Sequence, residues 1–469
     1  MRKYSTIFDL IESETASYDT GTVTVTEGYQ WSMKEHVRLS TLYKNSRFKN
    51  ETKEDRPFDN IILPVIRLQY RTEGFDVKDI IVYIDDITRY FKSFLVRKYH
   101  DRWALNQELD TFIDEMVESY VDYGGILIKQ VKGARPEVVD LTTIAFCDQT
   151  NLLGGPLAIR HHYSPDMLME MAEKGWGDEK NGATVSIEDL ITMASEEKRE
   201  GSEWTNKTPG KYVEVYEVHG MFPKRFVDEN SESEKYTRQV HIVAFYTDTS
   251  LQKKHVTLYK KEDKKQRFKV FLRDPIKGRA LGLGGIEELF EPQAWNNFDA
   301  IHIKNMLEAA SKTIFKSNDP AVAARNNVHD MENEIITLED GKDISQVDTV
   351  PRSIGLFEKA AARNEARAQQ LGGAPEPLLG ENPPSGQPFR STERIVFEGK
   401  GIHQYRQGKI ATFLGTVYKD WIFPDLMAEI TKEQEFLAEL SWKELKEVMD
   451  ALFESTKNRI KVEKVLNGE

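Results

Sequence analysis

Residues 278–318 read GRALGLGGIEELFEPQAWNNFDAIHIKNMLEAASKTIFKSN, a cluster of glycines that leads into a long helical pattern. Glycine permits the tight backbone turns that the entry to a helix needs. The apolar spacing predicts one helix from about residue 287 to about residue 318, roughly 30 residues against a mean of roughly 11 in globular proteins. We interpret so long a helix as an element that spans something.

The same glycine cluster invites interpretation as a phosphate loop, because amides at a helix N-terminus attract anions. A phosphate loop needs Gly-Lys-Ser/Thr at that point, whereas Gly285 is followed by Ile286 and Glu287. Acids in the first turn of the helix would also repel a phosphate. We therefore expect a structural helix entry and no nucleotide cofactor.

The chain before this helix combines helical and strand patterns. Residues 1–55 are polar, and we expect this arm to depend on something outside itself for order. Residues 58–123 repeat apolar side chains at three and four, which predicts helices, until Gly124 and Gly125 interrupt the pattern. ILIKQV and PEVVDLTTIAF then read as strands, and SPDMLMEMAEKGW begins a helix with Ser164 as N-cap. The fold class expected is α+β.

Four strand-like runs follow, YVEVYEVHGMF, RQVHIVAFYT, KHVTLYK and FKVFL, and they predict a small inserted antiparallel unit. Its last part carries eleven Lys and Arg against three acids between Lys253 and Arg279, a local balance of +8. One interpretation is a solvated strand edge that resists strand addition. The other is a docking surface for an acidic partner, with these candidates: Lys260, Lys261, Lys264, Lys265 and Arg267.

After the long helix, DMENEIITLEDGKDISQVDTV predicts a hairpin around Asp340-Gly341, and SIGLFEKAAARNEARAQQLGG predicts an alanine-rich helix. Lys359, Arg363 and Arg367 recur at i, i+4 and i+8 on that helix, which makes a basic stripe beside small side chains. The stripe is either an ordinary solvated face or a face turned toward a space shared by several copies. ENPPSG then forms a stiff turn, and the pattern from Ser391 onward is helical.

Composition limits the function classes. The net charge of −13 argues against a protein that coats nucleic acid, although it permits DNA to pass nearby without sticking. The single cysteine, Cys147, excludes a disulfide framework within one chain and reads as a buried structural thiol. Neither an apolar stretch long enough to span a bilayer nor the apolar core of a secretory signal is present.

Catalytic patterns are weak. His161 and His162 are adjacent and therefore point in different directions, so we expect a surface strand end and no metal. The Gly-x-Ser-x-Gly elbow of a serine hydrolase does not occur. A two-metal nuclease or phosphoesterase would need carboxylate clusters of the kind formed by these residues: Asp85, Asp86, Asp140 and Asp148. This remains the alternative to our expectation that the protein is not an enzyme.

The order of these parts resembles a tailed-phage portal protein, the connector between head and tail, most closely the portals of crAss-like short-tailed phages. Four stretches carry the resemblance: FDNIILPVIRLQYRTEGFDVKDI, TFIDEMVESYVDYGGILIKQ, Gly282 to Gln293, and LGENPPSGQPFR. The resemblance covers most of the chain and rests on the order of its motifs.

The resemblance implies a portal-type ring, usually a dodecamer, at one capsid vertex. It divides the chain into an N-terminal arm and wing (1–165), a clip-containing insert (166–285), a stem helix (286–320), a wing hairpin (321–352), a channel helix and loop (353–390) and C-terminal wing helices where a crown would begin (391–469). SIEDLITMASEEKRE is the candidate for the first stem helix. Portals often continue into a helical crown, so either the crown is absent or the sequence ends early.

The function implied is a conduit for double-stranded DNA that docks the terminase during packaging and the tail adaptors afterwards, next to the major capsid protein. Its location would be the virion, with assembly in the host cytoplasm, and it would need no membrane and no cofactor. The channel candidates are these residues: Arg352, Lys359, Arg363, Arg367 and Arg390. We expect Arg363→Glu with Arg367→Glu to impair packaging while the ring stays intact. A ring-forming tail adaptor or scaffold protein of the same particle is a further alternative.

Overall fold

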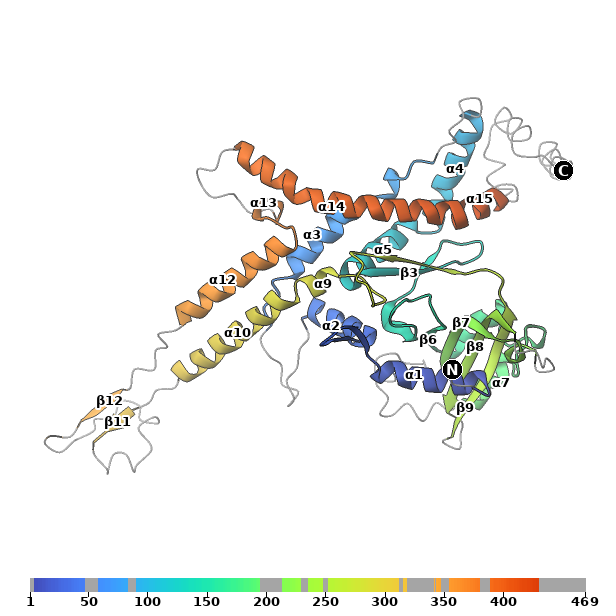
Figure 1. Ribbon diagram of the computed structural model, residues 1–469, viewed down its shortest axis with the longest axis horizontal. Coiled ribbons are helices and arrows are strands. Elements are labelled where there is room, and N and C mark those ends of the chain that lie inside the picture. Colours follow the sequence, from blue (N-terminus) through green and yellow to red (C-terminus); the bar gives the residue numbers. More distant parts are fainter. Residues whose placement is uncertain are drawn as a thin grey trace. The chain divides into compact units, whose positions relative to one another are not determined.

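Figure 1 shows the computed structural model of the chain, in which helices and strands are mixed along the sequence. The α+β class is therefore confirmed. The chain forms two compact units: unit 1 comprises Met1–Ser40, Gln69–Gly285 and His403–Glu469, and unit 2 comprises Thr41–Leu68 and Ile286–Ile402. The structure describes residues 4–46, 58–82, 90–194, 213–228, 235–247, 252–311, 315–318, 341, 343–346, 354–379 and 389–429.

Unit 1 is organised around a five-stranded antiparallel sheet. Its strands combine β-branched and aromatic residues with alternating burial, as expected of a sheet that packs against a core. The strand order is β5 (Ile144–Phe146), β6 (Leu157–Tyr163), β7 (Val213–Pro223), β8 (Tyr236–Thr247), β9 (Lys253–Glu262).

The strand-rich insert is not a separate unit. β6 precedes residue 165 and pairs along its whole length with β7. The fourth predicted strand, β10 (Phe268–Leu272), pairs with β3 (Gly125–Lys129) in a second sheet that also holds β4 (Glu137–Val138). The expectation of an independent insert was wrong because its strands complete their backbone hydrogen bonds with strands from the first half of the chain.

Two apolar clusters form the core of unit 1. In the first, α1 (Ile7–Thr20) packs on β5, β6 and β7. In the second, α6 (Pro165–Glu173) and α7 (Ile187–Met193) pack against β7, β8 and β9. The first helix of the N-terminal arm is thus ordered by the chain's own sheet, and α1 begins with a capping box between Thr6 and Asp9. The candidate first stem helix is the seven-residue α7, whose Ile187 and Leu190 are buried in this core, so the described part of it is no stem.

The glycine cluster allows backbone segments of unit 1 to approach one another more closely than a side chain would permit. The amide of Gly282 donates to the carbonyl of Gly124, and a Cβ at Gly282 would lie 1.6 Å from the carbonyl oxygen of Arg273. Gly124 ends α5 (Leu109–Tyr123) in the left-handed conformation, with φ of +77°. The cluster therefore brings three backbone segments together, which is a structural role at the entry to the helices that follow.

A buried charge cluster also fixes unit 1. The Glu73 carboxylate accepts from Arg273, His403 and Arg406 at 3.2, 3.0 and 3.4 Å, and Arg406 also pairs with Asp274 at 2.6 Å. The cluster joins the end of α3 (Leu63–Glu73) to α14 (Phe389–Val417) within unit 1. Removing one partner of such a buried pair leaves an uncompensated charge and is strongly destabilising.

Unit 2 contains an antiparallel pair of helices, α10 (Phe290–Ala310) and α12 (Ile354–Leu371), which lie side by side (Figure 1). The long helix is shorter than predicted. It stops at Ala310, and β11 (Phe315–Ser317) pairs with β12 (Ile344–Gln346) instead of continuing it. The aromatic Phe315 suits a strand, and strand pairing overrides the helical spacing there. The IITL half of the predicted hairpin lies outside the described residues.

The remaining elements connect these parts. The predicted helices over 58–123 are confirmed in the described residues, as α3, α4 and α5. Their bounds and those of the other short elements are β1 (Val23–Thr26), β2 (Tyr29–Trp31), α2 (Met33–Lys44), η1 (Val77–Asp79), α4 (Tyr90–Asn106), η3 (Leu141–Thr143), η4 (Glu179–Asn181), η6 (Lys224–Phe226), α9 (Gly285–Glu288), α13 (Glu376–Leu379), the π-helix η7 (Tyr418–Ile422) and α15 (Phe423–Glu429).

Candidate functional site

The α10–α12 pair holds the described part of the predicted channel stripe. Its seam is polar and aromatic. The His302 ring stacks on Phe357 with centroids 5.5 Å apart, and the Asn364 amide donates to Asp299 Oδ2 at 3.0 Å. Burial raises the pKa of Asp299. These contacts fix which face of α12 is turned toward α10.

The first turns of α10 are anchored by buried amides. Gln293 Oε1 accepts from the amide of Ile61 at 3.0 Å, and its Nε2 donates to the carbonyl of Asp59 at 2.7 Å. Asn296 donates to the same carbonyl at 3.1 Å, and the two side chains are 0% and 1% exposed. Hydrogen bonds of this kind hold α10 in a fixed rotation, because a turned helix would leave buried polar groups unsatisfied.

The C-terminal end of α12 is anchored by a close approach. Gly372 follows the helix, and a Cβ there would lie 2.1 Å from Val65 Cγ1. Gly373 adopts a left-handed φ of +62°, which ends the helix. The start of α10 and the end of α12 are therefore both held against residues 59–65. The predicted basic stripe lies on α12, on the part of the pair that extends from this anchor.

The basic stripe turns as it runs along α12. Four residues advance a helix by about 400°, so each step rotates the stripe by about 40°. Lys359 and Arg363 are exposed and have no ion pair within the described residues, while Arg367 pairs with Glu291 of α10 at 3.0 Å. Because both partners of that pair are exposed, it contributes little, about 0–1 kcal/mol. Arg352 and the side chain of Arg390 lie outside the described residues.

The predicted clip candidates lie at one end of the five-stranded sheet. Lys260 and Lys261 belong to β9, which is one of the two edge strands of the described five-stranded sheet. Arg267 pairs with Asp263 across the turn that leads to β10. Lys264 and Lys265 are exposed in the same turn. Charged side chains on an edge strand discourage pairing with another chain, which is the solvated-edge interpretation, while the docking surface stays a prediction.

The two carboxylates proposed for a nuclease that lie within the described residues, Asp140 and Asp148, accept hydrogen bonds from nearby backbone amides. Asp140 accepts from the amide of Thr142 at the start of η3, and Asp148 accepts from the amide of Thr150, both at 2.8 Å. Asp85 and Asp86 lie outside the described residues. Among the described residues, no group of three or more His, Cys, Asp or Glu side chains could hold a metal ion.

His161 belongs to a cluster that sequence reasoning missed. Glu217 of β7 pairs with Lys129 at 2.6 Å and with His219 at 2.8 Å, and His161 lies 3.5 Å away. Burial opposes ionisation of Glu217, but Lys129 and the two histidines outweigh it and hold the pKa of Glu217 well below its usual range. The expected surface strand end is therefore a partly buried ion cluster. The signal was available only from strand register, which places His161 and Glu217 on one face.

Cys147 is partly buried, with its Sγ 3.4 Å from Met33 Sδ. Burial raises the pKa of this thiol to about 12. A thiol that stays protonated at neutral pH is a poor nucleophile. This environment therefore favours a structural role for Cys147.

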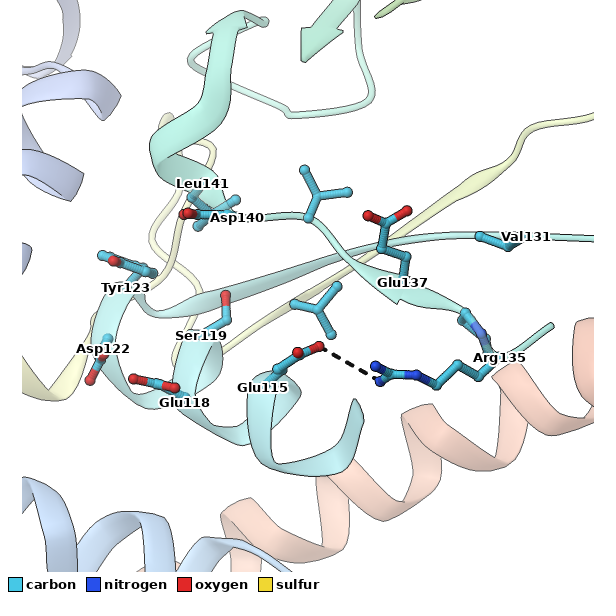
Figure 2. Close-up of a pocket in the computed structure, with 13 residues that line it drawn as sticks. Glu115, Glu118, Ser119, Asp122, Tyr123, Val131, Arg135, Glu137, Asp140 and Leu141 are labelled. Atoms are coloured by element: carbon cyan, nitrogen blue, oxygen red, sulfur yellow. Dashed lines mark ion pairs between the residues drawn. The ribbon is translucent and has the colours of Figure 1, made fainter. Parts of the chain in front are cut away.

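The described residues include an acidic pocket of about 640 Å³ in unit 1, between α5 and the segment that contains β4 (Figure 2). Glu115, Glu118 and Glu137 line it, and Arg135 pairs with Glu115 at 3.7 Å. Asp122 also lines it and accepts from the Tyr70 hydroxyl. Its lining carries more carboxylates than cations, so it does not suit a phosphate.

Comparison with known proteins finds only weak structural similarity. No family model matches the chain, and no curated protein matches it. A chain from the neck of an empty gene transfer agent particle is similar in structure with 9% identity and a TM-score of 0.36, covering 86% of this chain and 90% of that one. A chain from the virion of a native gene transfer agent particle has 10% identity and a TM-score of 0.36, covering 97% and 98%. No described helix is long and apolar enough to cross a membrane.

Proposed function

We propose that the chain is the subunit of a portal ring at one vertex of a tailed-phage capsid. The ring passes double-stranded DNA, docks the terminase during packaging and carries the tail adaptors afterwards. The proposal starts from the order of the sequence motifs, which resembles a portal protein. The structural observation that supports it best is the α10–α12 pair with the β11–β12 pairing in the segment that joins the two helices.

The pair suits a stem. At 1.5 Å per residue, the 21 residues of α10 and the 18 residues of α12 are about 31 Å and 27 Å long. Several such pairs arranged around one axis would enclose a passage. The predicted stem helix and the predicted channel helix are partners in one pair, so we place both in the stem and the β11–β12 pairing at its tip.

DNA transit requires weak contacts. Each lasting phosphate contact adds salt-dependent affinity, and a net charge of −13 keeps such contacts few. Lys359 is the stripe residue that lies on the side of α12 away from α10, because it is two residues after Phe357, which faces α10. We propose Lys359 as the residue that faces the passage.

Location on the particle tests this function. A small tag on the chain, labelled and viewed on intact particles, should mark one vertex of each capsid, the vertex that bears the tail. Label on many vertices, or on the tail alone, would contradict a portal and favour the adaptor or scaffold alternative. Metal-dependent DNA cleavage that is lost in Asp140→Ala would instead support the nuclease alternative.

A further inference from the structure

The α10–α12 pair carries opposite charges on its two edges. Phe357 and Asn364 of α12 both face α10, where they contact His302 and Asp299. Each helical residue is turned by about 100° from the one before it. The residues that precede Phe357 and Asn364 therefore lie on one edge of the pair, and the residues that follow them lie on the opposite edge.

The first edge, which we call the basic edge, comprises Leu356, Arg363, Arg367, Phe298 and Glu291, and its two arginines and one glutamate give it a net charge of +1. Arg367 belongs to it because it precedes the buried Ala368, and its partner Glu291 lies on the same edge. Phe298 is two turns beyond Glu291 on α10 and shares its face. Leu356 is 70% exposed and Phe298 is 48% exposed, so this edge presents apolar area together with positive charge.

The second edge, which we call the acidic edge, comprises Glu358 and Glu365. Both side chains are exposed and have no ion pair within the part of the chain that the structure describes. Two residues of the basic edge on α12 thus each have a residue of the acidic edge two positions later in the sequence: Glu358 follows Leu356, and Glu365 follows Arg363. Members of each couple differ in height along the helix by only about 3 Å.

Matched heights matter because a rotation about an axis nearly parallel to the helices keeps every residue at its own height. Under such a rotation the basic edge of one copy meets the acidic edge of the next copy, with Arg363 beside Glu365. We propose that a second copy of this chain packs on the basic edge through its acidic edge. The contact is head-to-tail, and repeated contacts of this kind close into a ring.

This inference rests on the proposed portal ring and adds the faces that build it. It also separates two uses of the basic stripe. Arg363 and Arg367 belong to contacts between subunits or within one subunit, and Lys359 lies on the remaining side. The exposed apolar area of Leu356 and Phe298 explains why the edge should meet protein, because DNA would gain nothing from burying it.

Charge reversal tests the edges. Arg363→Glu and Glu365→Arg, each alone, should lower the fraction of assembled rings in mass photometry at least tenfold, because each puts like charges at every contact. The two substitutions in one chain should restore assembly, since opposite charges would again face each other at every contact, with their signs exchanged. Lys400→Glu changes an exposed cation on α14 by the same amount and should leave assembly unchanged. Rings that persist in Arg363→Glu, or a double variant that fails to recover, would overturn the inference.

Disulfide trapping tests the direction of the contact, in a Cys147→Ser background. Leu356→Cys and Glu358→Cys chains should form few disulfide dimers alone and many when mixed, because only opposite edges meet. Self-cross-linking of Leu356→Cys chains would show a two-fold contact and overturn the inference. If the wild-type chain forms rings but neither charge reversal nor disulfide trapping gives the expected result, the proposed interface is wrong and the portal proposal is unaffected. A wild-type chain that forms no ring would remove both.

Discussion

Arg363 and Glu365 lie on opposite edges of the α10–α12 pair, although only Asn364 separates them in the sequence. The contact between Asn364 and Asp299 of α10 sets this arrangement. A spacing of i, i+4 and i+8 suggested one uninterrupted basic stripe. Packing against α10 divides it into a residue on the open side of α12, a residue on an edge and a residue paired with Glu291.

The buried amide of Gln293 should be a main determinant of the stability of unit 2. Gln293→Ala removes hydrogen bonds to Ile61 and Asp59 in a site with no access to water. We expect a loss of about 2–4 kcal/mol in the free energy of unfolding, measured by urea denaturation. Asn305→Ala, at an exposed position on the same helix, should change it by less than about 0.5 kcal/mol. Equal effects of the two substitutions would contradict the anchoring role.

Gly282 should tolerate no side chain. Gly282→Ala places a Cβ 1.6 Å from a backbone oxygen, which cannot move without disturbing β10. We expect a loss of more than about 3 kcal/mol or failure to fold. Gly408→Ala is the matched control, because it lies inside α14 with nothing within 4 Å of the added Cβ. It should raise the melting temperature slightly, since alanine favours helix by about 0.5–1 kcal/mol. A neutral Gly282→Ala would refute the packing account of the glycine cluster.

His241 should make unit 1 less stable in acid. Burial, together with Lys260 and His219, lowers the pKa of His241 to about 3, against about 6.5 in an unfolded chain. Between these values the unfolded chain binds a proton that the folded chain does not. The free energy of unfolding therefore falls as pH is lowered, by at most about 1.4 kcal/mol per pH unit. His241→Gln should flatten this slope between pH 6.5 and pH 4 in urea denaturation series, and an unchanged slope would contradict the assignment.

Lys359 should affect DNA and leave assembly intact. We expect Lys359→Glu to form rings as the wild type does but to package or retain less DNA, measured as the genome content of purified particles. The sequence-based expectation gave the same phenotype to Arg363→Glu with Arg367→Glu, whereas the edge contact predicts that Arg363→Glu disrupts the ring. Normal DNA content in Lys359→Glu particles would remove Lys359 from the passage.

Local patterns predicted much of the fold. The N-cap at Ser164, the helix over 354–371 and the strands β3, β7 and β8 follow from capping residues and periodicity. Pairing could not be predicted in the same way. The sequence around β10 does not show that this strand pairs with β3 and not with β9, the strand before it. Strand pairing and register depend on which faces become buried in the folded chain.

The site was predicted only in part for the same reason. The residues of the stripe were identified, but their division between the basic edge and the open side of α12 depends on Asn364 and Phe357, which carry no sequence signal of their own. The cluster around Glu217 joins Lys129 and His161 from separate strands. Such groups become visible only once strands are placed side by side.

Negative-stain or cryo-electron microscopy of the purified full-length chain tests the central claim most directly. We predict closed rings of about twelve copies with an open central channel. A chain that remains monomeric or dimeric, both alone and when produced together with the capsid protein, would contradict the portal account.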